Sequence, residues 1–408
     1  MTETLTPALF DPLAPEFFAD PYPVYRRLRE QPAAVIPNGP AQWVATRYRP
    51  VAALLKDPRL GNEYPAQLQQ RKLGDGDAAE FVLSSALHRE GADHATLRRF
   101  LGRVVSARPV EVLRQRIGAI VDELLEPARQ RGGLEVVADL ALPLPLAVAC
   151  ELVGVPAADR SYVQTWGLEV VKAFTMVLPE EQRPTVDEAV RQLRAYFADA
   201  VPAPLAQAMT EVDGAVGRDG LVDNVVFLFV SGFTTTVHLI ASACAMLLAH
   251  PDQWERVRRD RGHIDRALEE CLRYDAPIQH VSRLVAERLE VDGVTLRPGR
   301  MVHLLIGAAN RDPDEFPEPD RFDIGRDPNP HLSFGAGPHF CLGANLGRLE
   351  AAVLLERLLT TCARVELAGP AVRRPMQVFR TYERVPVAIS CVVAGSGGPS
   401  SQASPAWR

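Results

Sequence analysis

A single cysteine, Cys341, stands in a glycine-rich run that leads directly into a segment with helical periodicity. Gly335, Gly337 and Gly343 permit tight turns and let a flat ligand approach the backbone closely. Beyond the cysteine, apolar side chains recur at the spacing of one helix face, at Ala344, Leu346, Leu349, Ala351, Ala352, Leu354 and Leu355. The run therefore predicts a tight loop that presents one thiol at the start of a helix.

A thiol at that place faces backbone N–H groups and the positive end of the helix dipole, and both favour the thiolate form. A lone thiolate that is held rigidly in this way suits the axial position of a haem iron. The alternative is a buried structural cysteine in a glycine-rich loop, a common role for a lone cysteine.

The spacing Phe334-x-x-Gly337-x-x-x-Cys341-x-Gly343 resembles the haem-binding loop of the cytochrome P-450 family, the haem-thiolate monooxygenases. Because several positions are fixed within a short stretch, the pattern is specific. The resemblance implies that haem b is the cofactor and that Cys341 is its iron ligand. It also places Phe334 and Gly343 in the cofactor-binding loop.

Length and composition indicate one soluble globular unit. The chain has 408 residues, 47% of them hydrophobic and 24% charged. Length alone would suggest two or three domains, but no stretch reads as an interior linker. We therefore expect a single oxygenase domain over 1–393 and a disordered tail, rich in Gly, Ser and Pro, over 394–408.

Several partners and compartments are disfavoured by the sequence. A net charge of −6 argues against nucleic acid as a partner. We find no run of 18 or more apolar residues and no signal pattern at the N-terminus, which favours a cytoplasmic protein without a membrane anchor. The six cysteines form no C-x-x-C pair, so we expect reduced thiols and no structural zinc.

The periodicity of the chain predicts mostly helices with a few short strands. We expect a short helix within 20–29, a strand over 43–46, a long irregular loop over 62–90, interrupted helices over 94–249 with a long one over 221–249, a helix over 265–274, and strands over 284–291, 294–296 and 301–305. A mainly α protein with small β-sheets matches the single triangular fold that the resemblance implies.

Glu270 and Arg273 stand three residues apart on one predicted helix face, a spacing that permits an ion pair. Taken alone, an exposed surface pair is the better interpretation. The surrounding segment resembles the family's Glu-x-x-Arg helix. The resemblance implies that Glu270, Arg273 and Arg321 form a buried network that ties the haem loop to the core.

Four basic residues are assigned to the haem propionates by the same resemblance. These are His94, Arg98, Arg283 and His339. Buried carboxylates at a haem edge need charge-assisted donors, which these side chains provide. The alternative for any one of them is a solvated base at the surface. The residues that precede His94 depart from the family's usual run.

The long central helix carries Ser231, Gly232, Thr234 and Thr235, which resemble the family's oxygen-activation segment. The Thr235 hydroxyl can bond back to the carbonyl of Ser231, and Gly232 between them predicts a local bulge beside the iron where O₂ can sit. A threonine-rich apolar helix in the core is the alternative.

Thr234 occupies the position where the family usually has an acid. A hydroxyl can pass a proton but lacks the acidity of a carboxyl group. Three readings follow: protons pass through Thr234, Thr235 and water; the substrate contributes a polar group; or the enzyme is a peroxide-using oxygenase or an atypical oxidase.

The substrate pocket is expected to be apolar with a few polar groups. By resemblance, its walls come from 62–90, 163–180, 226–235, 278–284 and 376–382. The named candidates are Val163, Trp166, Val170, Phe174, Met176, Leu178, Phe227, Val230, Leu284, Gln279, His280 and Arg380. We expect the enzyme to hydroxylate, epoxidise or otherwise oxidise a small organic substrate, a secondary metabolite that a carrier protein can present.

No dinucleotide-binding fingerprint follows a strand, so electrons must come from a separate ferredoxin and ferredoxin reductase. Arg98, Arg99, Arg103 and Arg348 are candidates for docking an acidic ferredoxin, or else simple surface bases. The intact Cys341 and propionate bases disfavour a non-catalytic recruitment module. The lack of an output domain disfavours a haem-based gas sensor.

Overall fold

The computed structural model describes residues 9–39, 41–106, 108–199, 206, 209–210, 212, 216–376 and 379–391. The tail expected over 394–408 lies outside the described residues, and so does most of 200–215.

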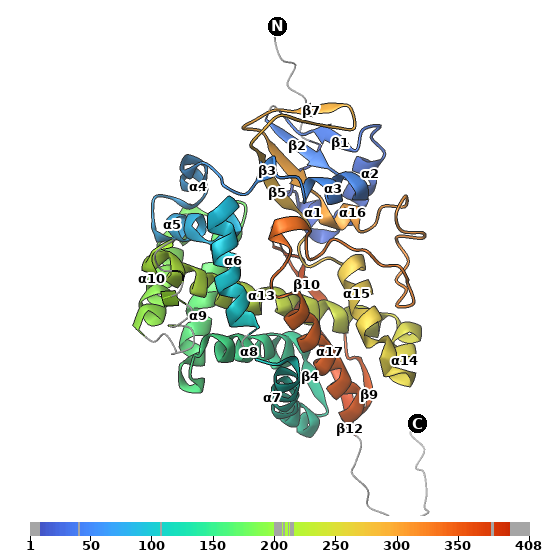
Figure 1. Ribbon diagram of the computed structural model, residues 1–408. Helices are drawn as coiled ribbons and strands as arrows, with labels where there is room; N and C mark the ends of the chain where they lie inside the picture. The colour runs from blue at the N-terminus through green and yellow to red at the C-terminus, as the bar shows by residue number, and fades with distance from the viewer. Residues whose placement is uncertain are drawn as a thin grey trace, which may run out of the picture.

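The molecule has a helical body and a smaller β-rich part (Figure 1). The longer helices are α6 (Gly91–Val105), α7 (Val110–Arg131), α8 (Pro143–Val153), α9 (Arg160–Val170), α10 (Arg183–Asp199), α13 (Arg218–Ala249), α15 (Ile264–Tyr274) and α17 (Ala344–Thr361). The shorter ones are α1 (Pro15–Ala19), α2 (Pro21–Arg29), α3 (Tyr48–Leu54), α4 (Ala66–Leu73), α5 (Asp77–Ser84), α14 (Pro251–Arg259) and α16 (Ile306–Ala309). A π-helical stretch, η2 (Val136–Ala141), precedes α8, and 3-10 turns include η1 (Ala86–His88), η4 (Val171–Phe174) and η7 (Gly337–His339).

The strands form small sheets. The largest has the order β1 (Val35–Pro37), β2 (Gln42–Ala45), β8 (Met301–Leu304), β5 (Val281–Val285) and β3 (Leu60–Gly61), with only β2 and β8 parallel. A second sheet places β12 (Pro386–Cys391) between β4 (Gly133–Glu135) and β9 (Cys362–Leu367). Two hairpins complete the set: β6 (Leu289–Val291) with β7 (Val294–Leu296), and β10 (Val372–Arg374) with β11 (Thr381–Arg384). The expected mainly α fold with small sheets is confirmed.

Helix α13 is the central element and crosses the middle of the molecule (Figure 1). Its first half belongs to a buried cluster with α5, α6, α8, α9 and α10. Its second half belongs to another with α7, α15 and α17. The helix is apolar around most of its circumference, as expected for a helix packed on all sides. The Ser231–Thr235 segment therefore lies where the two clusters meet.

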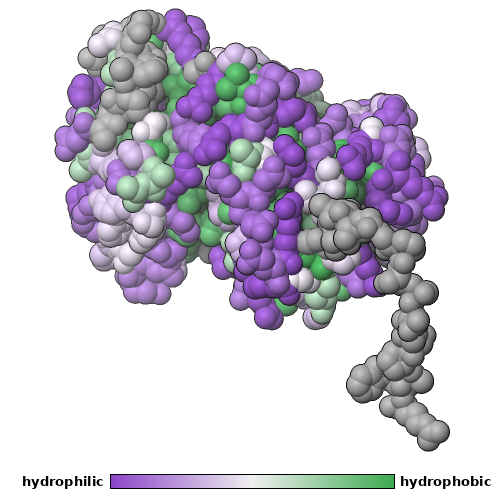
Figure 2. All heavy atoms as spheres, turned by 90° about the horizontal axis from the view of Figure 1, so that it is seen from below, coloured by the Kyte–Doolittle hydropathy of each residue, from purple (hydrophilic) through white to green (hydrophobic). Residues whose placement is uncertain are grey.

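Two segments, Val136–Val153 and α13, are long and apolar enough to cross a membrane by length and composition alone. In both, most of the apolar stretch is buried inside the protein, 61% and 72% respectively, which is the behaviour of core helices. The face of the molecule seen in Figure 2 is largely hydrophilic, with apolar residues in scattered patches.

The predicted loop over 62–90 is wrong, because this stretch contains α4, α5 and η1. Helix α5 turns Phe81 and Val82 into the core, but with only eight residues it shows too little periodicity to reveal itself. Its first turn is held by a distant residue, since the N–H of Ala78 donates to Asp187 Oδ1 of α10 at 2.8 Å. A cap supplied by another helix leaves no local sequence signal.

Other boundaries differ less. The strand expected over 284–291 is two strands, β5 and β6, because the chain leaves the large sheet after Val285. The helices expected over 20–29, 221–249 and 265–274 correspond to α2, α13 and α15.

Candidate active site

A cavity of about 640 Å³ lies between α13, α17, the β5–β8 edge and the 62–90 segment. Its size falls in the range of ligand and cofactor sites, roughly 300–1,000 Å³. All the residues predicted from the sequence to ligate the iron, bind the haem or activate oxygen line this one cavity. They are Ser231, Gly232, Thr234, Thr235, His94, Arg98, Arg283, Phe334, His339, Cys341 and Gly343.

The loop that carries Cys341 is held tightly by its backbone. Gly337 has φ +73°, and a Cβ there would come within 2.8 Å of the carbonyl oxygen of Leu55. The N–H of Cys341 donates to the carbonyl of Phe334 at 2.9 Å, which closes the loop on itself. The sulfur therefore lies just ahead of α17 in a conformation that only glycine at 337 allows.

Opposing effects act on the ionisation of Cys341. Burial raises the pKa of the Cys341 thiol above its ordinary value, while the N–H of Gly343 and the charges of Arg98 and Arg348 lower it. The N–H of Gly343 therefore favours the thiolate, as expected at a helix start, while the loss of water opposes it. A metal cation at the sulfur would reverse this balance, since coordinating thiols are deprotonated.

The predicted propionate bases gather on one side of the cavity. Arg283 is 7% exposed and donates from Nη1 only to the neighbouring carbonyl of Ser282, at 2.9 Å. Among the described residues, no carboxylate lies within ion-pair distance of Arg98 or Arg283. The rings of His94 and His339 lie 4.1 Å apart between centroids. Such a cluster of basic groups, two of them buried and two half-buried, suits an anionic ligand.

Glu90 belongs to the same cluster and was missed by the sequence reasoning. Its Oε1 lies 3.0 Å from His339 Nε2 and accepts from the N–H of Asn62 at 2.7 Å. Burial raises the pKa of Glu90, but these hydrogen bonds and the nearby histidines hold it below its usual range. Burial also lowers the pKa of His94 to about 4, so this ring is neutral near pH 7.

The hydroxyl groups of α13 form a ladder of back-bonds. Thr235 Oγ1 donates to the carbonyl of Ser231 at 2.9 Å, as predicted. Ser231, Thr234 and Thr236 bond in the same way to the carbonyls four residues earlier. The predicted bulge is wrong, because α13 is continuous α-helix from Arg218 to Ala249. Each of these backbone carbonyls therefore accepts a side-chain hydroxyl without interrupting the helix.

A buried ion pair links α15 to the segment that precedes the cysteine loop. Arg273 Nε lies 2.7 Å from Glu270 Oε2, and both side chains are fully buried. The assignment of Arg321 is wrong, since its side chain is 59% exposed and pairs with Glu318. Arg326 takes its place, with Nε 3.4 Å from Glu270 Oε2. Arg321 contributes only its carbonyl, which accepts from Arg273 at 3.0 Å.

The apolar wall of the cavity agrees with part of the expected set. Phe174, Met176, Phe227 and Val230 line it, as does His280. Other candidates do not line it: Val163, Val170 and Leu178 are packed in the core, and Trp166, Leu284, Gln279 and Arg380 also lie elsewhere. Gln279 is engaged by Tyr25 and by the carbonyl of Ala276.

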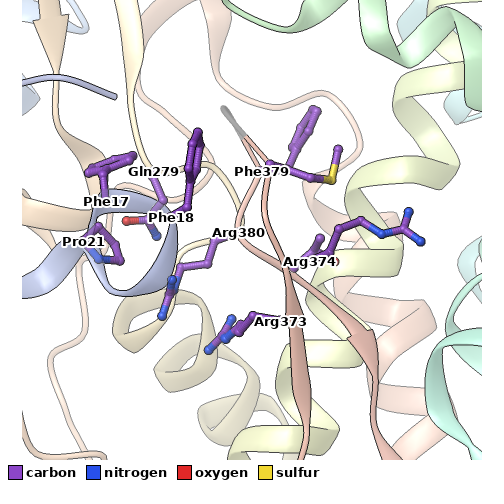
Figure 3. A pocket seen from close by; sticks show the side chains of 10 residues that line it. Phe17, Phe18, Pro21, Gln279, Arg373, Arg374, Phe379 and Arg380 are labelled. Carbon is purple, nitrogen blue, oxygen red and sulfur yellow. The ribbon is translucent and has the colours of Figure 1, made fainter. Parts of the chain in front are cut away.

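Arg380 is held in an ion cluster outside the large cavity. Its Nε lies 2.5 Å from Asp275 Oδ1, and Arg373 Nη1 lies 2.7 Å from the other carboxylate oxygen. Arg373 and Arg380 point to the same side beside a small cavity of about 20 Å³, and Arg374 points away from both (Figure 3). The prediction that Arg380 anchors substrate is therefore wrong.

Comparison with known proteins assigns the family. A family model described as Cytochrome P450 matches residues 167–367. The cytochrome P450 monooxygenase PikC of Streptomyces venezuelae is 34% identical over 94% of this chain and 95% of its own. The polyketide biosynthesis cytochrome P450 PksS of Bacillus subtilis is 31% identical over 94% of this chain and 99% of its own. The crystal structure of P450BioI in complex with an acyl carrier protein ligated to hexadec-9Z-enoic acid is 32% identical, with a TM-score of 0.84, and covers 92% of this chain and 99% of that one.

The chain belongs to the cytochrome P450 family. It is therefore a monooxygenase, and the family implies a haem-iron cofactor. The residues of this cytochrome P450 fit that group. The cavity offers one cysteine sulfur at Cys341, and the half-buried Arg98 and the buried Arg283 lack carboxylate partners among the described residues, as sites for two propionates require.

Further cavity residues of this cytochrome P450 were not singled out from the sequence. Asn62, Gln69, Lys72 and His88 come from the 62–90 segment, and Glu350 comes from α17. The sequence offered a signal only for Glu350, which interrupts the apolar stripe of its helix. The others lie in the segment that was read as an irregular loop.

The expected ferredoxin-docking arginines are only partly available. Arg348 pairs with Glu269 at 2.6 Å and stacks over the ring of Phe334, and Arg98 lines the cavity. Arg99 is exposed and donates to Thr96 on its own helix.

Proposed function

We propose that this cytochrome P450 holds haem b in the 640 Å³ cavity, with Cys341 as the iron ligand and His94, Arg98, Arg283 and His339 binding the propionates. The observation that carries the proposal is the meeting of this thiol and these bases at one cavity, although they come from separate segments. When bound, the haem supplies activation of O₂ for insertion of one oxygen atom into the substrate.

The chain itself binds and orients the substrate and excludes water. Phe174, Met176, Phe227 and Val230 offer an apolar surface, which suits a hydrophobic carbon skeleton. Asn62 Nδ2 and Gln69 Oε1 are buried without a hydrogen-bond partner, and they lie on the same lining as Lys72. These groups support a substrate that also carries oxygen functions.

Thr235 and Thr234 handle protons in this proposal. Both hydroxyls line the cavity and can turn from their back-bonds toward a ligand there. Because Thr234 replaces the usual acid, a peroxide-using oxygenase is the second candidate. It predicts product formation from hydrogen peroxide without any electron-transfer protein.

The substrate is proposed to be a secondary metabolite. PksS is a relative named for polyketide biosynthesis, and P450BioI was crystallised with an acyl carrier protein. Both support oxidation of a natural product that is free or bound to a carrier. A separate ferredoxin and ferredoxin reductase in the cytoplasm complete the proposed system.

Optical titration of the purified ferric protein with a natural-product panel tests the proposal. We expect a Soret band typical of thiolate ligation and a low-spin to high-spin shift with compounds of the right class. A C341A variant should lose the thiolate spectrum. A wild-type protein without a thiolate Soret band would overturn the assignment. If only carrier-bound acyl compounds shift the spectrum, the carrier-bound substrate is identified.

A further inference from the structure

Glu350 of α17 is a carboxyl group in the wall of the haem cavity that no step described so far uses. Its side chain is 1% exposed, and Oε2 has no hydrogen-bond partner. Among the described residues, no cation lies within ion-pair distance of it. A buried carboxyl group without a partner is rare, because its burial is costly, and such a group in a cavity is a candidate for a functional role.

Helix geometry places Glu350 on the same wall as the hydroxyl ladder. Leu346, Gly347 and Glu350 recur at helical spacing on α17, and all three line the cavity. A Cβ on Gly347 would lie 3.5 Å from Thr236 Oγ1 of α13, so the two helices approach closely at this face. Glu350 stands one turn farther along α17.

The pKa of Glu350 differs from that of Glu269, a second carboxyl group that contacts α17 through Arg348. Burial raises the pKa of Glu350 well above its ordinary value, and no charged group opposes the shift. Burial also raises the pKa of Glu269, but Arg348 and His331 lower it to about 2. Burial therefore favours the neutral acid form of Glu350, whereas Arg348 and His331 favour the ionised form of Glu269.

We propose that Glu350 is the acid that supplies protons to the haem cavity, in place of the carboxyl group that is missing at Thr234. This inference rests on the proposed function. The O–H bond of Glu350 breaks, and its proton passes through a cavity water to the hydroxyl of Thr236 or Thr235. That hydroxyl gives its own proton to the oxygen being reduced. The carboxylate of Glu350 then takes a proton from solvent, and the redox partner supplies the electrons.

Infrared spectroscopy of the resting haem-loaded enzyme tests the protonation state without turnover. The difference between wild type and E350Q should show the C=O stretch of a neutral carboxylic acid, and this band should shift in D₂O. E356Q, on the same helix but exposed and paired with Arg114, should lack the band. A wild-type spectrum that shows only an ionised carboxylate for Glu350 would overturn the proposal.

Turnover measurements separate a proton source from a structural residue. We expect E350Q to lose product per reducing equivalent by roughly 10²-fold, the lower end of the range for a positioned general acid, with a changed solvent isotope effect. T234E in the E350Q background should restore coupling, because it returns an acid to the ladder. Unchanged coupling in E350Q, or failure of T234E to restore it, would contradict the proposal.

The design remains decisive if E350Q does not fold. E350D keeps the acid, and we expect it to retain the infrared band and more coupling than E350Q; equal loss in both would count against the proposal. If the wild-type enzyme shows no thiolate Soret band, the proposed function itself is contradicted. If the Soret band is normal but the infrared band of a neutral carboxylic acid is absent, only the role of Glu350 is contradicted.

Discussion

At the scale of single residues, Gly337 shows how a backbone position constrains the site. Its φ of +73° and its approach to the Leu55 carbonyl leave no room for a side chain. We expect G337A to destabilise the loop by roughly 1–3 kcal/mol, the usual range for strain of this kind, and to lower haem occupancy. The ratio of Soret to protein absorbance measures it.

G102A is the matched control, because a Cβ on Gly102 in α6 meets nothing nearer than Leu342 at 3.9 Å. This substitution should leave occupancy unchanged or raise stability slightly, since alanine is the better helix former. Equal occupancy in G337A and G102A would show that the loop tolerates a side chain.

Thr235 is the second residue-scale prediction. Removing its hydroxyl in T235A leaves the Ser231 carbonyl with its helical partner but takes one group from the proton path. We expect more hydrogen peroxide and less product per reducing equivalent, while T235S stays close to wild type. Coupling in T235A equal to that in T235S would refute the role of the hydroxyl.

At the scale of elements, the ion network behind the cysteine loop joins α15 to the segment before that loop. The side chain of Arg326 is 10% exposed and lies beside Glu270, whereas the side chain of Arg321 is 59% exposed. We expect R326A to lower the free energy of unfolding by about 2 kcal/mol, because part of a buried carboxylate loses a partner. R321A should stay within about 0.5 kcal/mol of wild type. Urea denaturation of both variants measures the difference, and equal values would restore Arg321 to the network.

The sequence predicted the parts of the site that depend on short-range patterns. The Cys341 loop, the Thr235 back-bond and the boundaries of α13 follow from local spacing. Arg326 and Arg321 are five residues apart in one irregular segment, and only the three-dimensional path decides which one turns inward. Helix α5 was missed because its cap, Asp187, comes from another helix.

Long-range packing explains the remaining misses. Arg380 is an expected pocket residue by position, but the buried Asp275 draws it into an ion cluster. The roles of Glu350 and Glu90 also depend on packing, since Glu350 is buried and Glu90 is half-buried beside His339. The burial of Glu350 and the contacts of Glu90 with His339 and Asn62 depend on the path of the chain in space, and they decide the chemistry of these two groups.

At the scale of the whole molecule, buried neutral histidines make stability depend on pH. Burial lowers the pKa of His238 to about 3 and that of His280 to about 3. Below pH 6.5 the unfolded chain binds protons at these sites while the folded chain does not. Stability is therefore fully present above pH 6.5 and is lost as pH falls toward 3.

We expect H238Q to show a smaller loss of unfolding free energy between pH 7 and pH 5 than wild type, by about 2 kcal/mol for one such histidine. H263Q, at the surface beside Asp260, should keep the wild-type dependence. Urea denaturation at the two pH values measures both. An unchanged slope in H238Q would mean that His238 takes up a proton in the folded state.

The position of α13 between two buried clusters has a consequence for how such a chain changes over time. The groups assigned to oxygen and protons lie on α13 and α17, inside the packed body. The polar groups proposed to meet the substrate, Asn62, Gln69 and Lys72, lie in the 62–90 segment, which is a separate piece of chain. Substitutions that alter which molecule enters need not disturb how it is oxidised, so new substrates can be acquired while the reaction is kept.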